Sequence, residues 1–284
     1  MTATKVKTPT KPAGKAVVKK AGTAVGAVLD LEREMLADSG QGFEEAGRDA
    51  YAIPFLLMLQ DLSPQTKKKM DGYIEGARPG MIFNSVTRQL FDGEKGIYVI
   101  PCHWSQVFIE WVPRSKGGGF VAAHAPGDSR VAQGIRQKGA GLVLPNGNEL
   151  MDTRQHYVLA IDPKTRRGEG CLLPFKSTGL KISRRWMSQM RNALIEINGK
   201  LVEPPMFAYQ YHLTVEEGAN DQGSWYQFAV GERQRVTDPQ LYQQARAFGQ
   251  AMREGAAKVN YEELRPTVDE EPAPPADLDD NVED

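Results

Sequence analysis

The stretch MIFNSVTRQLFDGEKGIYVIPCHWSQVFIEWV, residues 81–112, decides the fold. It divides into short segments rich in Val, Ile, Phe, Tyr and Trp, with Asn, Asp, Gly and Pro between them, which is the pattern of β-strands joined by turns. We expect strands over residues 81–86, 88–91, 96–102 and 106–112. Because only a few residues separate consecutive segments, the pattern favours antiparallel pairing over a βαβ arrangement.

Further hairpins continue this pattern toward the C-terminus. Residues 142–144 and 149–151 flank Pro145-Asn146-Gly147-Asn148, which is a strong turn signal because Asn-Gly accepts positive φ at little cost. Two more hairpins are expected, pairing residues 157–161 with 170–175 and residues 206–215 with 224–230.

Helices are expected before, between and after the strands along the sequence. Residues 179–197 carry the strongest helical pattern, and a last helix should run from Pro239 to about residue 253, with Asp238 or Thr237 as its cap. Shorter helical segments are expected over residues 29–37, 43–51 and 65–74.

These elements together predict a mainly β domain of the α+β class. An antiparallel barrel of the oligonucleotide-binding (OB) type, five strands with one inserted helix, fits the order best, with the remaining helices flanking it. The glycine-rich connection over residues 117–136 is expected to be a mobile surface loop, with one or two helical turns between residues 129 and 138. We therefore predict a single domain over residues 29–260.

Two tails of opposite charge flank this domain. Residues 1–28 contain six lysines and no acid, whereas residues 269–284 contain eight acids and no Lys or Arg. Both compositions offer too little apolar surface to offset the entropy of ordering, so we predict disorder over residues 1–28 and 261–284. A mobile polyanion can compete with nucleic acid for a basic surface or bind basic proteins; a tail that only aids solubility is an equally open reading.

The cysteine content and the hydropathy indicate a cytoplasmic protein without membrane contact. Cys102 and Cys171 are the only cysteines, and two thiols make neither a disulfide framework nor a paired metal knuckle. No stretch approaches the roughly 18 apolar residues of a membrane helix, and the Lys-rich start lacks the apolar segment of a secretory signal. An organelle transit peptide would be richer in Arg and Ser.

A run of cations is the most informative interior feature. The predicted phosphate contacts in it are Lys164, Arg166, Arg167, Lys176, Lys181, Arg184, Arg185 and Arg191. On a helical period the last four share one side, opposite Ile182, Trp186 and Met190. A solvated helix face is the ordinary alternative, but such a face would normally carry Glu partners at i,i+4, and no acid occurs between residues 171 and 194.

Aromatic residues give the second indication. Proteins that bind single strands place rings beside a positive groove, and each stacked base contributes about 1–3 kcal/mol. The rings predicted to bind bases are Trp186, Tyr209, Tyr211 and Trp225. Strand alternation allows only about half of the aromatic residues to share an exposed face, and core packing is the commoner role for any one ring.

Signatures of catalysis are weak. The chain has no phosphate loop, no dinucleotide-binding glycine motif, no nucleophile elbow and no H-E-x-x-H. Cys102, His103, His124 and Cys171 have the ligand types of a zinc site, but their spacing is a poor match. The carboxylates do not group into a two-metal nuclease site. We therefore expect a protein that is not an enzyme and needs no metal or cofactor.

Four segments carry a family resemblance. They are PGMIFN at 79–84, VIPC at 99–102 leading into FIEW at 108–111, GGGF at 117–120 and STGLKISRRW at 177–186. Over roughly residues 50–230 the chain resembles a family of uncharacterised bacteriophage proteins associated with phage single-stranded DNA-binding proteins. The resemblance implies a barrel with an acidic C-terminal tail that recruits replication proteins. The Lys-rich arm and the long glycine loop depart from compact examples and leave the barrel topology open.

The expected function is binding of single-stranded DNA in phage replication or recombination. The acidic tail is expected to contact phage DNA polymerase, helicase or recombination proteins through Asp277, Asp279, Asp280, Glu283 and Asp284. The sequence is compatible with a homo-oligomer. Two alternatives stay open: a phage structural or assembly protein that does not bind DNA, and a metal-dependent nuclease or recombination enzyme.

Overall fold

The computed structural model describes residues 31–45, 51–137, 141–220, 223–255 and 259–264, within two compact units, Met1–Gly47 and Arg48–Asp284. In the first unit residues 31–37 are helical, which confirms most of the expected first helix. Of the expected second helix, residues 43–45 and 51 are not helical and the rest lies outside the described residues. The expected disordered arm and the acidic residues of the tail also lie outside them.

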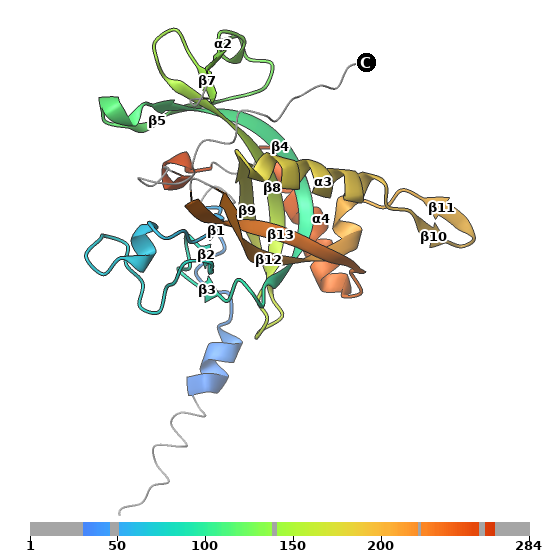
Figure 1. Ribbon diagram of the computed structural model, residues 1–284. Helices are drawn as coiled ribbons and strands as arrows, with labels where there is room; N and C mark the ends of the chain where they lie inside the picture. Colours follow the sequence, from blue (N-terminus) through green and yellow to red (C-terminus); the bar gives the residue numbers. More distant parts are fainter. Residues whose placement is uncertain (1–30, 46–50, 138–140, 221–222, 256–258, 265–284) are drawn as a thin grey trace, which may run out of the picture. The chain divides into compact units, whose positions relative to one another are not determined.

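The second unit is built on an eight-stranded antiparallel sheet (Figure 1). Its central pair is β4 (Ile97–Val112) with β8 (Glu149–Ile161), which are paired along nearly their whole length. Strand order is β13-β12-β4-β8-β7-β6, with β5 also on β4 and β9 also on β8. The bounds of these strands are β5 (Gly119–His124), β6 (Ile135–Gln137), β7 (Gly141–Val143), β9 (Gly168–Lys176), β12 (Tyr209–Asn220) and β13 (Gly223–Arg235).

Both faces of the sheet are covered where β4 and β8 cross the body. Val158 and Ala160 of β8 enter the main core cluster, whereas Leu159 and Ile161 enter a second cluster on the opposite face. Alternate side chains of a strand point to opposite faces, so a fully apolar run fits a strand buried on both sides. This explains why residues 157–161 are all buried.

Two helices lie on opposite faces of this sheet. From α3 (Gly179–Arg191), Trp186 and Met190 enter the main core. From α4 (Pro239–Arg253), Leu241 and Ala245 pack on the second cluster. The expected final helix is confirmed: the Asp238 carboxylate accepts hydrogen bonds from the backbone N–H groups of the first turn and caps it. No helix of the described residues is both long and apolar enough to span a membrane.

A smaller antiparallel sheet joins two edges of the large one. It consists of β1 (Leu56–Met58), β2 (Ile82–Asn84) and β3 (Leu90–Phe91). A β-bridge between Phe55 and Leu172 connects its first strand to β9, and Gln60 hydrogen bonds to the backbone of β13. The prediction of a mainly β, antiparallel fold is confirmed, but the sheets do not close into a barrel, because this small sheet stands between the edges β9 and β13.

The region from residue 96 to 137 is more regular than expected. One strand, β4, replaces the two predicted strands and absorbs a register shift between Pro101 and His103. The expectation of a loop over residues 117–136 missed two strands, because β5 pairs with β4 and β6 pairs with β7. The helical turn expected after residue 129 is confirmed as α2 (Ser129–Ala132). The glycines at 117–119 adopt positive φ and supply the turn after the short η3 helix (Arg114–Lys116).

The predicted helix over residues 179–197 ends early. It stops at Arg191, and β10 (Ile195–Ile197) and β11 (Lys200–Val202) form a separate hairpin. Asn198 and Gly199 both have positive φ, as in the tight turns that Asn-Gly favours. The turn at Asn198-Gly199 pairs residues 195–197 with 200–202, so these three residues form a strand and the helix must end before them.

The three other predicted hairpins are confirmed, with β7 paired to β8, β8 to β9 and β12 to β13. In the last of these both strands reach closer to the turn than predicted and β13 runs on to Arg235, whereas β12 begins later than predicted, at Tyr209. The predicted helix over residues 65–74 is not formed: Gln65 and Thr66 belong to the short η2 helix (Pro64–Thr66), and turns follow. Short helical turns also occur at η4 (Met206–Ala208) and η5 (Tyr261–Leu264); the latter is ordered although it begins the segment expected to be disordered.

Candidate nucleic-acid interface

The predicted cations do not form one surface. Lys164, Arg166 and Arg167 are exposed in the β8–β9 turn, which the Asp162 carboxylate organises by accepting backbone hydrogen bonds at 2.7–2.8 Å. These hydrogen bonds, with one from Gln89, lower the pKa of Asp162 to about 2. β9 separates this turn from α3; at about 3.3 Å per residue its nine residues span roughly 27 Å.

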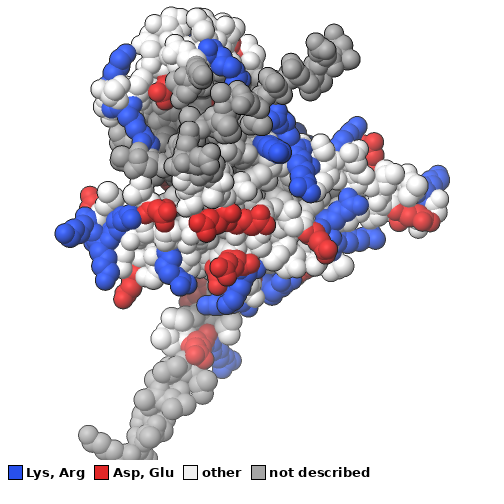
Figure 2. Space-filling model, viewed as in Figure 1, with Lys and Arg blue, Asp and Glu red and all other residues white. Residues whose placement is uncertain are grey.

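The cations of α3 do lie together. Lys181, Arg184, Arg185 and Arg191 are all exposed, as the helical period predicted. Arg191 forms a 2.8 Å ion pair with Glu203 at the end of the helix, between two exposed side chains. Figure 2 shows basic side chains gathered over α3, with acidic side chains on the adjacent surface. The basic area is therefore local and does not extend across this face.

Two of the predicted stacking rings are in the core. Trp186 and Tyr211 are each only 1% exposed, so neither can receive a base. The Trp186 ring stacks on His156 at a centroid distance of 4.7 Å and meets Tyr211 edge-on at 5.5 Å. Trp186 lies on the apolar side of α3, and Tyr211 lies on the inward side of β12. Both sides are buried in the main core, so both rings serve in core packing.

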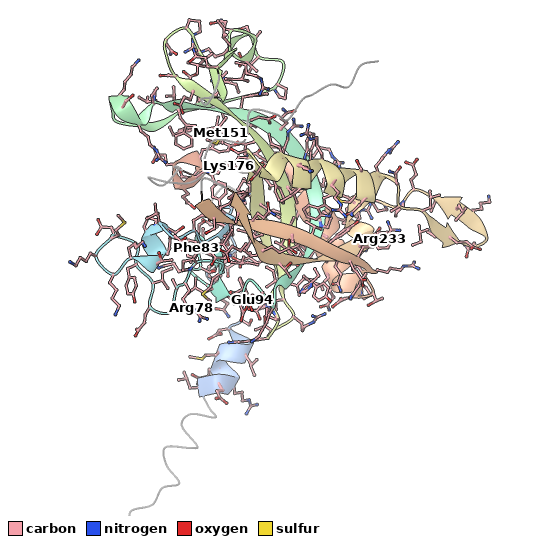
Figure 3. All side chains as sticks on the ribbon, viewed as in Figure 1. Arg78, Phe83, Glu94, Met151, Lys176 and Arg233 are labelled. Carbon is pink, nitrogen blue, oxygen red and sulfur yellow. The ribbon has the colours of Figure 1, made fainter. Side chains whose placement is uncertain are left out.

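The other two predicted rings are partly exposed and lie in different places. Tyr209 is covered by the Arg233 guanidinium, 5.0 Å from the ring centroid. Trp225 lines a groove together with Lys176. Figure 3 labels Lys176 and Arg233, which lie well apart in this view. Of the twelve residues predicted to contact nucleic acid, two, Lys176 and Trp225, line this groove together.

This groove has a volume of about 510 Å³. Its apolar walls include Phe83, Ile182 and Phe228. Trp225 and Tyr226, consecutive residues of β13, also line it. The lining comes from residues 57–65, Phe83 of β2, the junction of β9 with α3, residues 224–228 of β13 and residues 263–264. Polar side chains at Gln60, Asp61, Lys176, Thr178 and Glu263 complete it. An aromatic and apolar hollow with a few polar groups is typical of a ligand site.

Glycines allow the two rings of β13 to lie close to the backbone. A Cβ at Gly218 would stand 2.9 Å from the Trp225 ring, and a Cβ at Gly80 would stand 2.9 Å from the Tyr226 ring. Gly80 also has a backbone φ of +80°, which residues with a side chain rarely adopt. The rings therefore rest on positions where a larger residue would displace them.

Helical geometry connects the groove with the basic side of α3. Ile182 lines the groove and is partly buried, at the border between the buried and exposed sides of the helix. Arg185 follows at i+3 and so neighbours Ile182 on the helix surface, and Lys181 lies slightly further round on the same exposed side. The cations nearest to the groove are thus Lys176 in its lining and Lys181 and Arg185 beside it.

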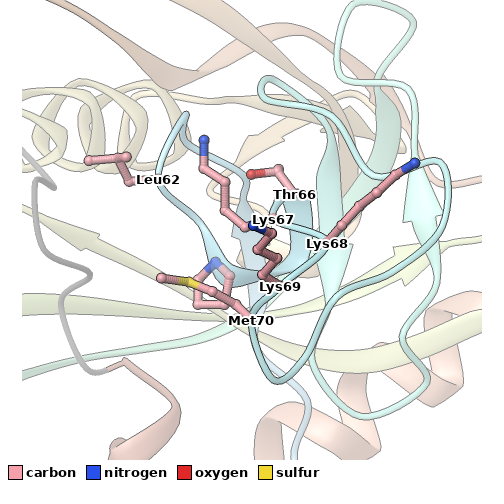
Figure 4. Close-up of a pocket in the computed structure, with 7 residues that line it drawn as sticks. Leu62, Thr66, Lys67, Lys68, Lys69 and Met70 are labelled. Carbon is pink, nitrogen blue, oxygen red and sulfur yellow. The ribbon is translucent and has the colours of Figure 1, made fainter.

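A second hollow of about 540 Å³ adjoins the groove, because Leu62 and Pro64 line both. It lies within one loop and includes Lys67, Lys68 and Lys69 (Figure 4). In this view the ends of the Lys67 and Lys68 side chains point apart, so the lysines do not converge on one point. They add positive charge on the other side of the Leu62–Pro64 wall.

The most completely hydrogen-bonded polar cluster lies elsewhere, on the distal halves of β4 and β8. The buried Glu110 carboxylate contacts His124 at 2.9 Å, Arg130 at 3.0 Å and Asn148 at 2.6 Å. Burial alone would raise the pKa of Glu110, but hydrogen bonds from Arg130, Asn148, His124 and Asn146 lower it to about 2. The sequence offered no signal for this cluster, whose members come from different elements.

Neither cysteine is placed for chemistry. Cys102 and Cys171 are buried, and burial raises the pKa of the Cys102 thiol to about 12 and that of Cys171 still further. His124 forms a hydrogen bond with Glu110, and the His103 ring lies tilted against the ring of Tyr157. Within the part of the chain that the structure describes, no three His, Cys, Asp or Glu side chains are arranged to hold a metal ion.

His156 and Ser183 form a second buried polar contact, at 2.7 Å between Nε2 and Oγ. Both residues are at most 1% exposed, and burial lowers the pKa of His156 to about 3. A neutral imidazole enclosed by Phe175 and Trp186 has no path to a substrate. This contact fixes α3 on β8 instead.

Comparisons with known proteins give one match. No curated protein and no solved structure matches the chain. A family model described as Pam3 phage gp34-like protein matches residues 20–258, which include every strand described above, α3 and the groove lining except Glu263 and Leu264. The chain therefore belongs to the Pam3 phage gp34-like family of bacteriophage proteins.

Proposed function

We propose that this protein binds single-stranded DNA in phage DNA replication or recombination. One observation carries the proposal: an aromatic groove that contains Lys176 and Trp225 lies directly beside the cations of α3. Positive side chains that follow the backbone, next to rings on which bases stack, are the common plan of proteins that bind single strands.

The proposed contacts divide into two kinds. Lys176, Lys181 and Arg185 hold phosphates at the edge of the groove, and Arg184 extends this basic area along α3. Trp225 and Tyr226 receive unpaired bases, which must leave a duplex before they can enter a hollow. This arrangement favours single strands over duplex DNA. Lys164, Arg166 and Arg167 lie too far from the groove to share the same few nucleotides.

The rest of the proposed role follows from composition. The protein acts by binding, without catalysis and without a metal or cofactor, in the cytoplasm of the host cell. The acids Asp277, Asp279, Asp280, Glu283 and Asp284, which lie outside the described residues, recruit phage DNA polymerase, helicase or recombination proteins. A flexible polyanion suits such contacts because it can engage basic surfaces without a fixed shape.

The test is a titration of fluorescent single-stranded and double-stranded oligonucleotides at two salt concentrations, with and without magnesium. We expect single strands to bind more tightly, and binding to weaken with salt because each neutralised phosphate releases counterions. With three phosphate contacts the slope of log K against log salt should be about −2. Absence of any shift would contradict the proposal, and loss of intact DNA only in magnesium would indicate a nuclease.

A second candidate function, as an assembly protein, rests on the β10–β11 hairpin. Ile197 and Leu201 are 47% and 69% exposed there, and Leu194 just before it is 54% exposed. A two-stranded hairpin is marginally stable alone, and clustered exposed apolar residues usually mark a contact surface. Abundance of the protein in purified phage particles, with no oligonucleotide binding, would favour this function.

A further inference from the structure

The groove is lined in part by the residues that come just before the C-terminal segment 265–284. Glu263 and Leu264, the last two described residues, are part of its lining. The twenty residues that follow, 265–284, therefore start at the groove itself. We propose that this C-terminal segment of the same chain occupies the groove and lies along the basic side of α3 when no other ligand is bound. The inference rests on the proposed function only in taking the groove as the binding site.

The η5 helix fixes this starting point on the body. The hydroxyl of Tyr261 accepts a 2.8 Å hydrogen bond from the Gln155 side chain, and its ring stacks on Phe120 at 5.6 Å. Tyr261 and Leu264 also pack on the third core cluster, which includes Phe55 and Leu172. The segment that follows consequently begins at a defined place beside the groove.

The composition of the segment matches the surface it would meet. The groove walls are apolar and aromatic, and residues 265–284 contain three aliphatic residues larger than Ala, which are Val268 just before the first acid, and Leu278 and Val282 between acids. Those acids would face cations on both sides: Lys181 and Arg185 on α3, and the lysines 67–69 across the Leu62–Pro64 wall. Opposite charges of this kind set the position of a flexible chain as well as its affinity.

The distances and the tethering also favour the same chain as the occupant. Asp277 lies thirteen positions after Leu264, which allows a reach of up to about 45 Å when extended. Val268 is only four residues from the groove. A short flexible tether gives the segment an effective concentration in the millimolar range at the groove, so even weak contacts are enough to keep the groove occupied.

The test uses the full chain with a nitroxide attached at Val282→Cys. Selective labelling is feasible because Cys102 and Cys171 are buried. At low salt we expect the label to broaden the backbone amide NMR signals of Ile182 and Tyr226, with recovery at high salt and little effect on Leu201 of the β10–β11 hairpin. Equal broadening at all three positions, or none, would overturn the inference.

Two variants and a mixing control sharpen this result. In the labelled chain, the double change Lys181→Glu and Arg185→Glu should reduce the broadening, whereas Lys200→Glu, an exposed lysine on β11, should not. Broadening that persists when labelled unenriched chains are mixed with unlabelled ¹⁵N chains would indicate occupation by a second copy and would overturn the assignment to the same chain.

Addition of an oligonucleotide separates this inference from the proposed function. If both hold, single-stranded DNA restores the Ile182 and Tyr226 signals as it displaces the segment. Broadening that DNA leaves unchanged, together with no DNA binding, would refute the proposed function while leaving the tail in the groove. DNA binding without any broadening would refute the inference alone.

Discussion

Gln60 and Tyr226, 166 positions apart, are joined by a pair of hydrogen bonds. The Gln60 amide donates to the Tyr226 carbonyl oxygen at 2.7 Å and accepts from the Tyr226 backbone N–H at 2.9 Å. One side chain thus replaces a neighbouring strand at this point of the edge strand β13. It also connects the two sides of the groove, since residues 57–65 and 224–228 both line it.

Replacing Gln60 with Ala should lower the free energy of unfolding by about 1–3 kcal/mol, because both backbone groups of Tyr226 lose their partner in a partly buried site. Urea unfolding measures this loss. Gln250→Ala is the control: Gln250 is exposed on α4 and its side chain donates a hydrogen bond to the exposed Glu254, so its change should stay within about 0.5 kcal/mol. Equal effects of the two changes would contradict a special role for Gln60.

Glu110 should make the distal part of the sheet sensitive to acid. Its folded pKa, about 2, lies below the ordinary value of 4.5, so the carboxylate stabilises the fold above pH 4.5 and this contribution is lost as the pH falls toward 2. The shift corresponds to about 3 kcal/mol. Hydrogen exchange at pH 5 and pH 3 should show earlier opening of β5 and β7 at the lower pH. In the Glu110→Gln variant β5 and β7 should open early at both pH values. A Gln variant whose exchange depends on pH as in the parent protein would contradict this account.

His156 should contribute in a different pH range. Burial holds its folded pKa near 3, whereas an unfolded histidine has a pKa near 6.5, so the unfolded state gains protons first and stability falls as the pH drops from 6.5 toward 3. By pH 4 the loss amounts to about 3 kcal/mol. His156→Phe should remove this part of the pH dependence of urea unfolding. The ring proton shifts of His156 should stay constant from pH 7 to 4; titration in that range would refute the prediction.

Charge reversal on α3 tests the proposed interface. Arg184→Glu with Arg185→Glu should weaken binding of single-stranded DNA roughly tenfold at low salt, for every sequence alike, because phosphate contacts carry no base information. Fluorescence anisotropy with two unrelated oligonucleotides measures this. The control pair, Arg166→Glu with Arg167→Glu in the distant β8–β9 turn, should have a much smaller effect. Similar losses for both pairs would mean that overall charge, and not the groove edge, governs binding.

Leu201 tests the hairpin as a contact surface. Because its side chain is 69% exposed, Leu201→Ser should change the free energy of unfolding by less than about 0.5 kcal/mol. If the hairpin joins subunits, the same change should shift the mass measured by light scattering toward the monomer. A large loss of stability would show instead that Leu201 packs within its own chain.

Local signals in the sequence were reliable where a few neighbouring residues decide the structure. Asp238 and Pro239 mark the start of α4, and Asn146-Gly147 marks the turn between β7 and β8. The same logic applied to Asn198-Gly199 would have predicted the β10–β11 hairpin. There the helical pattern over residues 179–197 obscured a turn signal that was present in the sequence.

The site was harder to predict because exposure depends on packing between distant elements. Trp186 and Trp225 are similar residues in sequence terms, but one side of α3 faces the core whereas Trp225 lies across Gly218 at the edge of the sheet. Glu110 illustrates the same limit, since its partners His124, Arg130 and Asn148 join it only once β5, α2 and the β7–β8 turn fold onto β4. The spacing of residues along the chain does not predict such tertiary contacts.

The continuous pairing of β4 with β8 has a mechanical consequence. Beyond the register shift between Pro101 and His103, the two strands pair residue by residue to the Glu110 cluster. A load applied at the distal end must therefore be transmitted through twist of a shared ladder, since no flexible joint lies between the two ends. We therefore expect the distal region to move together with the hydrophobic core on which the two strands are anchored.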